Sequence, residues 1–162
     1  MININKNMEK IFIGSNKNEI KNIEKILFEV FSNVKISNKT SNHLQCIVSS
    51  LREDFDKYCF SLIVDAIFLN DLYFIIIKIP LPLSEFKDKI DNFYSRLLDL
   101  NSKHQGVYSS INEEENDLFI NSSLSYKKNA DLKTFFIMSA KNFNNYVDDL
   151  EEKEKEKLLF II

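Results

Sequence analysis

The sequence predicts an α+β domain with one antiparallel sheet of about five strands and about three helices, in the order α-β-β-β-α-β-β-α. Several stretches place apolar residues at steps of three and four, which is typical of amphipathic helices, and the stretches between them alternate apolar with polar residues, as strands do. The strand-like stretches come in neighbouring pairs, as antiparallel hairpins require. With 162 residues, 44% of them hydrophobic and 28% charged, the chain can build its own core. We therefore expect one domain over residues 1–162, with a leader at 1–15 and a charged and apolar tail at 151–162.

A first helix is expected over residues 16–34. Asn16 and Glu19 have the spacing of a helix N-cap and its capping-box partner. The apolar residues that follow at helical spacing are Ile20, Ile23, Leu27, Val30 and Val34. The polar residues 37–42 end this pattern. From residue 43 the period changes to two, and the apolar set of the predicted strand is Leu44, Cys46 and Val48.

The stretches 58–68 and 72–79 form a predicted hairpin. Asn70 and Asp71 tolerate the left-handed backbone region, so they suit a two-residue loop between the strands. This loop sets the register, and the expected cross-strand pairs are Leu69 with Leu72, Ala66 with Ile75, and Val64 with Ile77.

The predicted hairpin has two unlike faces. The apolar face, which should carry the core, consists of Phe60, Leu62, Val64, Ala66, Phe68, Tyr73, Ile75, Ile77 and Ile79. The mixed face consists of Ser61, Ile63, Asp65, Ile67, Phe74, Ile76 and Lys78, and Asp65 and Lys78 should be diagonal neighbours on it. Something should cover the mixed face, either a partner or the following helix at 84–104.

Pro80 and Pro82 are expected to end the second strand of this hairpin, because proline donates no hydrogen bond to a sheet. Ser84 can then cap a helix over residues 84–104, which ends before Gly106. The apolar stripe of this helix is Phe86, Ile90, Phe93, Leu97 and Leu100.

Two short strands and a helix complete the chain. The strands are expected at 107–111 and 118–126, joined by the acidic tip 113–117. Asn129 or Asp131 caps the last helix. Its stripe is Leu132, Phe135, Phe136, Ser139, Phe143, Tyr146 and Leu150.

The composition argues against several classes of protein. Only two glycines occur, whereas P-loop and Rossmann phosphate sites need several close together. The net charge of −3, with Arg52 and Arg96 as the only arginines, argues against nucleic-acid binding. Residues 1–10 lack the apolar region of a signal peptide, and no apolar stretch is long enough to span a bilayer. We expect a cytoplasmic protein that binds neither nucleic acid nor membrane and holds no cofactor.

The two cysteines are expected to be buried free thiols. A hairpin loop at 51–54 would place Cys46 opposite Cys59, within disulfide reach. However, the two cysteines fall on opposite faces of the hydrophobic pattern, and disulfides are rare in a reducing compartment.

No metal site and no catalytic residues are expected. His43 and His104 have no second ligand at a suitable spacing. The acidic tip 113–117 lacks the alternate spacing and the glycine of a calcium loop, so a solvated hairpin tip is favoured.

One part of the sequence is similar to a known family. The run Arg96-Leu97-Leu98-Asp99-Leu100-Asn101, followed by Gly106, the hairpin at 107–120 and a helix from about residue 131, resembles the YbjN-like family, which belongs with the type III secretion chaperone-like fold. These motifs span roughly residues 85–150, and the upstream order of one helix and three strands is similar to the same fold. The resemblance implies non-enzymatic binding by a small acidic dimer that holds a partner's segment extended against an apolar surface. It implies no catalytic residue.

Two surfaces are candidates for contact with a protein partner or for a homodimer. The first lies on the mixed face, at Ile63, Ile67, Phe74 and Ile76, and the second lies on the predicted helix, at Phe86, Ile90, Phe93 and Leu97. The end of the chain, Leu158–Ile162, is a further apolar feature. Two other classes stay open. One is a small-ligand sensor or enzyme with a pocket between helix and sheet, where Asp65 and Lys78 supply the polar pair. The other is a structural homo-oligomerisation domain.

Overall fold

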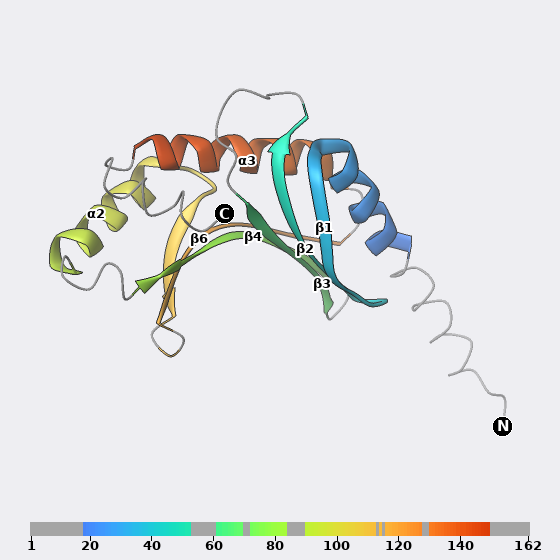
Figure 1. Ribbon diagram of the computed structural model, residues 1–162, viewed down its shortest axis with the longest axis horizontal. Coiled ribbons are helices and arrows are strands. Elements are labelled where there is room, and N and C mark those ends of the chain that lie inside the picture. Colours follow the sequence, from blue (N-terminus) through green and yellow to red (C-terminus); the bar gives the residue numbers. More distant parts are fainter. Residues whose placement is uncertain are drawn as a thin grey trace, which may run out of the picture.

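The computed structural model describes residues 18–52, 61–69, 72–83, 90–112, 114, 116–127 and 130–149. A six-stranded antiparallel sheet in the order β1-β2-β3-β4-β6-β5 is covered by helices (Figure 1). The elements are a first helix over 18–30, β1 Phe31–Lys39, β2 His43–Leu51, β3 Leu62–Leu69, β4 Leu72–Pro82, α2 Ile90–Lys103, β5 Tyr108–Asn112, β6 Asp117–Tyr126 and α3 Leu132–Asp148. The α+β class and the single antiparallel sheet are confirmed, with six strands rather than the expected five.

The additional strand is β1, which occupies the end of the predicted first helix. The helix ends at residue 30, and β1 pairs antiparallel with β2 from Phe31↔Leu51 to Lys39↔Leu44. Val34 lies four residues after Val30, so it fits a helical stripe, yet the run Val34-Lys35-Ile36 also alternates as a strand does. The weak helix propensity of serine and asparagine and the ladder with β2 favour the strand.

The β3–β4 hairpin has the predicted register. Leu69 pairs with Leu72, Ala66 with Ile75, and Val64 with Ile77. The described residues of the predicted apolar face all lie in or against the core, and of these Leu62, Val64, Ala66, Tyr73, Ile75, Ile77 and Ile79 are buried. Phe60 and the loop residues 70–71 lie outside the described residues.

The expectation that Pro80 and Pro82 end the strand is wrong. β4 continues through both residues, with Pro80 opposite Phe119 and Pro82 opposite Asp117 on β6. The ladder between β3 and β4 ends at Ile63↔Lys78, so the prolines have β6 as a neighbour but not β3. A proline is compatible with a strand wherever its missing N–H would face a side that has no ladder.

The second half of the chain follows the prediction closely. α2 ends at Lys103 and Gly106 has a φ of +81°, a left-handed conformation that suits glycine after a helix. β5 and β6 form the expected hairpin. Of the two candidate caps, Asp131 caps α3 and accepts a hydrogen bond of 3.1 Å from the Thr134 backbone N–H. Ser84 and Phe86 lie outside the described residues.

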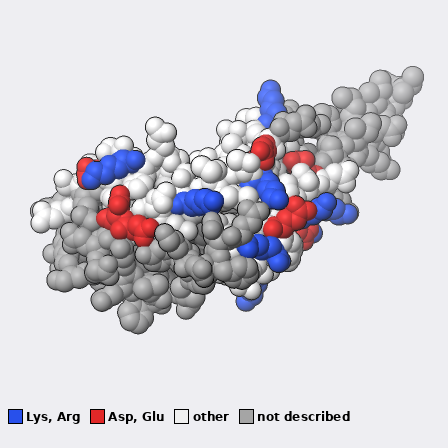
Figure 2. Space-filling model, turned by 90° about the horizontal axis from the view of Figure 1, so that it is seen from above, with Lys and Arg blue, Asp and Glu red and all other residues white. Residues whose placement is uncertain are grey.

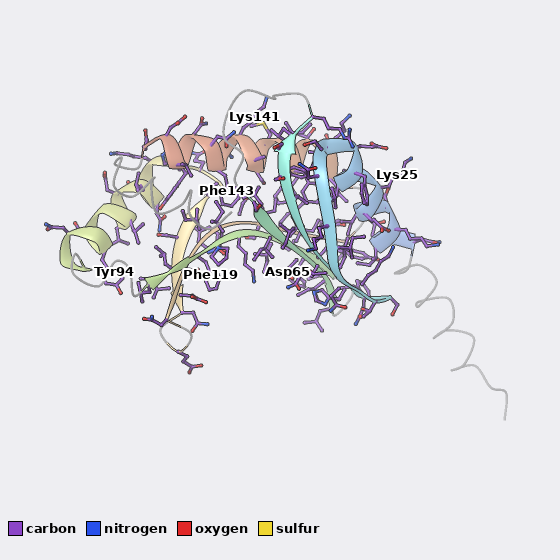
Figure 3. All side chains as sticks on the ribbon, viewed as in Figure 1. Lys25, Asp65, Tyr94, Phe119, Lys141 and Phe143 are labelled. Atoms are coloured by element: carbon purple, nitrogen blue, oxygen red, sulfur yellow. The ribbon has the colours of Figure 1, made fainter. Side chains whose placement is uncertain are left out.

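All described helices pack on one face of the sheet (Figure 1). The largest fully buried side chains include Tyr146, Phe136 and Phe143 of α3, and Leu97 and Leu100 of α2 belong to the same core. Figure 3 places Phe143 between α3 and the sheet. The described part of α2 therefore helps to cover the core face, and it does not cover the mixed face of the hairpin.

The helix-covered side shows no large area of one charge among the described residues. Figure 2 views this side and shows basic and acidic side chains interspersed with uncharged surface. Such mixing gives little long-range attraction for a highly charged partner.

Candidate functional site

The face of the sheet that points away from the helices is the candidate site, and we call it the open face. Its central residues are Lys35 on β1, His43, Gln45 and Ile47 on β2, Ile63, Asp65 and Ile67 on β3, Phe74, Ile76 and Lys78 on β4, and Phe119 and Asn121 on β6. No helix within the described ranges lies against it (Figure 1). Figure 3 shows Asp65 and Phe119 on the side of the sheet away from α3.

Apolar side chains occupy much of the open face without being fully buried. Ile47 is 39% exposed and Ile67 is 37% exposed, while Ile63, Phe74 and Ile76 are half-buried. Ile67 and Phe74 are register partners across the hairpin, so their side chains lie side by side. The four sheet residues predicted as a contact surface, Ile63, Ile67, Phe74 and Ile76, make up the apolar patch of the open face. Ile67, Phe74 and Ile76 are neighbours in it, whereas Ile63 lies beside Ile47 and Lys78, on the other side of the Asp65–Lys78 ion pair.

The four helix residues predicted as a contact surface do not share one environment in the structure. Leu97 is only 4% exposed and packs in the core. Ile90 and Phe93 belong to α2, but their side chains are not described, and Phe86 lies outside the described residues. Among the described side chains, the accessible part of the predicted contact surface is therefore on the sheet.

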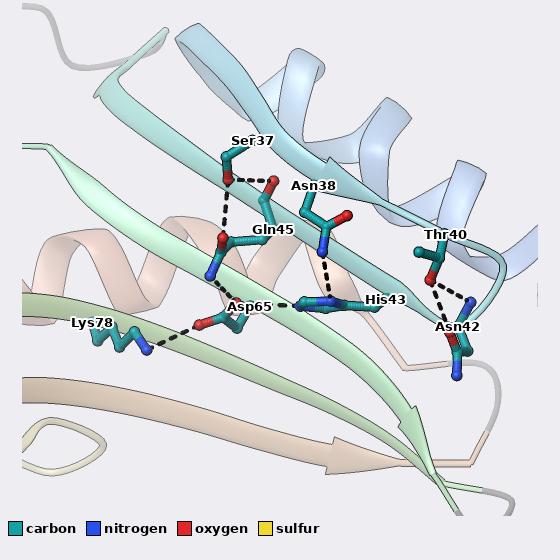
Figure 4. A network of polar contacts seen from close by, with 8 residues as sticks. All are labelled: Ser37, Asn38, Thr40, Asn42, His43, Gln45, Asp65 and Lys78. Carbon is teal, nitrogen blue, oxygen red and sulfur yellow. Dashed lines mark hydrogen bonds and ion pairs between the residues drawn. The ribbon is translucent and has the colours of Figure 1, made fainter.

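Asp65 lies within this apolar patch as a buried carboxylate. It is 7% exposed, and it is held from both neighbouring strands (Figure 4). Lys78 Nζ on β4 lies 3.0 Å from Oδ2 in an ion pair, and Gln45 Nε2 on β2 donates a hydrogen bond of 2.9 Å to Oδ1. The diagonal contact between Asp65 and Lys78 that the hairpin register predicts is confirmed.

The contacts extend from Asp65 to the outermost strand on that side. His43 Nε2 lies 3.4 Å from Asp65 Oδ1, and Asn38 Nδ2 on β1 lies 3.3 Å from His43 Nδ1 (Figure 4). Ser37 Oγ, also on β1, donates a hydrogen bond of 3.1 Å to the Gln45 carbonyl oxygen. One polar network therefore joins the four strands β1 to β4 across the open face.

Burial raises the pKa of Asp65, but the hydrogen bonds from Lys78 and Gln45, the charge of Lys78 and the contact with His43 together lower it more. The result is a pKa below the usual value of 3.8. Asp65 is therefore an ionised carboxylate near neutral pH. Its charge is compensated locally, which explains how it is accommodated among isoleucines.

The network continues toward β6 through an aromatic contact. Lys78 Nζ lies 5.4 Å from the centroid of the Phe119 ring, within the range of a cation–π interaction. Asn121 lies on β6, which is the neighbour of β4 on the side away from β3. It is 6% exposed, and its Nδ2 donates a hydrogen bond of 2.7 Å to Ser110 Oγ on β5. Polar groups on the open face are thus satisfied by one another across strands.

The sequence does not predict that His43 and Gln45 belong to this network. The register in which Cys46 would face Cys59 is not adopted, because Cys46 pairs with Val64 and Gln45 pairs with Asp65. Cys46 is a buried free thiol, as expected, and Cys59 lies outside the described residues. Burial, with smaller contributions from the charges of Asp65 and Glu24, raises the pKa of Cys46 to about 12, so this thiol is a poor nucleophile.

His104 has a different environment at the other end of the molecule. Its Nε2 lies 2.9 Å from Asp149 Oδ2, and its ring lies against Tyr146 at a centroid distance of 5.3 Å. Together these contacts join the residue after α2 to the end of α3. No group of three or more histidine, cysteine, aspartate or glutamate side chains among the described residues is arranged to hold a metal ion.

Comparison with known proteins gives no significant match to a family model, to a curated protein or to a solved structure. A search of the described residues for a helix long and apolar enough to cross a membrane also finds none.

Proposed function

We propose that this chain is a non-enzymatic protein-binding domain that holds a segment of a partner protein against the open face. The observation that carries the proposal is a set of incompletely buried apolar side chains on a sheet face that no described helix covers, among which Ile47 and Ile67 are 39% and 37% exposed. Exposed apolar surface on one face is typical of interaction sites.

The geometry of a sheet face suits an extended segment. Side chains on one face of a strand recur at every second residue, so neighbouring strands present rows of apolar side chains at regular spacing. Alternate side chains of an extended segment also point to one side, so a segment that lies on these rows can place them against the apolar side chains. The resemblance of residues 85–150 to the YbjN-like family, which belongs with the type III secretion chaperone-like fold, implies a partner segment held extended against an apolar surface, and so supports the same proposal.

A second copy of the chain is one such partner in this proposal. Two twisted antiparallel sheets can pack face to face with their strands nearly aligned, about 10 Å apart. A homodimer formed in this way would bury Ile67 and Phe74 of both copies. We propose homodimer formation as one form of the same protein-binding function.

A pair of matched variants tests the proposal. Ile67→Asp places a charge in the apolar patch, and Leu98→Asp places the same charge on α2 at a side chain that is 70% exposed. We expect Ile67→Asp to lose both binding to a panel of extended apolar seven-residue peptides and any homodimer, because an unpaired charge would be buried on association. Leu98→Asp should behave as the parent chain does.

Fluorescence polarisation measures the peptide binding, light scattering measures the mass in solution, and circular dichroism checks that both variants remain folded. The proposal is contradicted if the folded parent chain is monomeric and binds no peptide of the panel. It is also contradicted if Ile67→Asp binds and associates as the parent chain does.

A further inference from the structure

Strand β5 forms one edge of the sheet, so one row of its backbone groups faces away from the only strand beside it. β5 follows β6 at the end of the order β1-β2-β3-β4-β6-β5. In an antiparallel pair, successive residues direct their N–H and C=O groups alternately toward the partner strand and away from it. A row of outward groups of this kind is a template on which a further strand can pair.

The Asn101 side chain on α2 binds outward groups of β5. Its Oδ1 accepts a hydrogen bond of 2.7 Å from the Ser109 backbone N–H, and its Nδ2 donates one of 3.4 Å to the Ser109 carbonyl oxygen. A side-chain carboxamide offers N–H donors and a carbonyl acceptor, as the backbone does. Asn101 therefore makes with Ser109 the two hydrogen bonds that a residue of a neighbouring strand would make.

Two further contacts hold this carboxamide in position. Ser109 Oγ donates a hydrogen bond of 3.1 Å to Asn101 Oδ1, and the Tyr146 hydroxyl on α3 donates one of 3.4 Å to the same oxygen. Tyr146 is fully buried and Asn101 is half-buried. The group that closes the β5 edge is thus supplied by α2 and fixed in part by α3.

The sequence of β5 lacks the features that commonly prevent edge strands from pairing. The strand Tyr108-Ser-Ser-Ile-Asn112 contains no charged residue and no proline. The opposite edge differs, because β1 carries Lys35 and Lys39 and has an irregular register between Ile36 and Asn38. A strand can pair antiparallel with its own copy under two-fold symmetry, so a second copy of the chain is the expected occupant of an unprotected β5 edge.

We infer that Asn101 takes the place of a neighbouring strand at β5 and prevents this edge from pairing with a second copy of the chain. Without the carboxamide, the freed groups of Ser109 would pair with those of the other copy and continue the sheet across two chains. This inference does not rest on the proposed function, because the open face and the β5 edge are different surfaces.

Amide hydrogen exchange of the parent chain, followed by NMR, tests the contact without any substitution. We expect the Ser109 amide to exchange at least about tenfold more slowly than in an unfolded peptide, because Asn101 Oδ1 accepts its hydrogen bond. The Ser110 amide faces β6 by the same alternation and provides the comparison within the strand. Exchange of Ser109 at the rate of an unfolded peptide, while Ser110 is protected, overturns the inference.

Asn101→Leu removes both hydrogen bonds to Ser109 and keeps a side chain of similar size. We expect this variant to remain folded by circular dichroism, and its mass by light scattering to rise about twofold above that of the parent chain as the concentration is raised. Ser109→Pro, added to Asn101→Leu, should restore the mass of the parent chain. Proline removes the outward N–H of β5 and takes no hydrogen bond from the ladder with β6.

A folded Asn101→Leu chain with the mass of the parent overturns the inference, and so does an increase in mass that persists with Ser109→Pro. Asn101→Ala frees the same groups of Ser109 with a smaller side chain and carries the same expectations if the leucine variant does not fold. Adding Asn101→Leu to Ile67→Asp should raise the mass in the same way, because Ile67→Asp changes the open face alone. The two proposals can therefore fail separately.

Discussion

Asp65 and Lys78 form an ion pair of 3.0 Å although neither is the register partner of the other. Asp65 lies opposite Ile76 and Lys78 lies opposite Ile63, so the pair spans the β3–β4 hairpin diagonally. Diagonal neighbours lie within reach of long side chains such as lysine. The contact therefore depends on the register of the hairpin, and it places a compensated charge in an apolar patch.

We predict that the two members of this pair are strongly coupled in their effect on stability. Lys78→Met should lower the free energy of unfolding by about 1–3 kcal/mol, because it leaves a nearly buried carboxylate without its cation. The double variant Asp65→Asn/Lys78→Met should lose less than the sum of the two single changes. Urea unfolding of the four proteins in this cycle measures the coupling, and additive effects would contradict it.

The free energy of unfolding should decrease in acid because the Asp65 carboxylate becomes protonated. Its pKa in the folded state lies below its usual value of 3.8, so its contribution is present above the unfolded-state pKa and is lost as the pH falls through the folded-state pKa. The difference in unfolding free energy between the parent chain and Asp65→Asn should be constant above about pH 5 and shrink at lower pH. Urea unfolding between neutral and acidic pH gives this difference, and a gap that stays constant throughout would refute the prediction.

Substitution of Gly106 should destabilise the protein because of the backbone conformation at this residue, and not because an added side chain would be crowded. Its φ is +81°, and a Cβ at this position would lie 3.4 Å from Asn142 Nδ2. Gly106→Ala should lower the unfolding free energy by about 1 kcal/mol. Asparagine tolerates the left-handed region better than alanine, so Gly106→Asn should cost less. Thermal unfolding of the two variants compares them, and an equal or reversed order would be the contrary result.

Cys46 should resist alkylation in the folded protein. Its thiol is buried, and because its pKa is about 12, little thiolate exists at pH 8. Iodoacetamide should label the Cys46 peptide rapidly in urea and slowly without it, as mass spectrometry of a digest can show. Equal labelling in both conditions would mean that the thiol is accessible in the native state.

The sequence was sufficient to predict the β3–β4 register but not the β2–β3 register. Because Leu69 pairs with Leu72, only two residues separate β3 from β4, which leaves little freedom for their register, whereas β2 ends at Leu51 and β3 begins at Leu62. A connection of that length carries no local signal for register. Gln45 could therefore not be placed beside Asp65 from the sequence.

The same limitation explains the missed strand β1. Val34 fits a helical stripe that starts at Ile20, and together with Ile36 it also fits the alternation of a strand. The choice depends on the ladder with β2, which is a long-range contact. The apolar set of α3 was predictable because its period is unambiguous over several residues. Those of β3 and β4 were predictable because the hairpin register aligns one wholly apolar set from each strand.

The order of the elements along the chain also has a consequence for synthesis on the ribosome. Strands β1 to β4 are consecutive neighbours in the sheet, so they can pair as soon as they emerge. Their core face, however, is completed by α3, and the chain from Leu83 to Asp131 must be made before that helix begins. During this interval the nascent sheet has both of its apolar faces accessible, with the first helix over only part of one of them. The growing chain is then itself a candidate substrate for the cell's molecular chaperones.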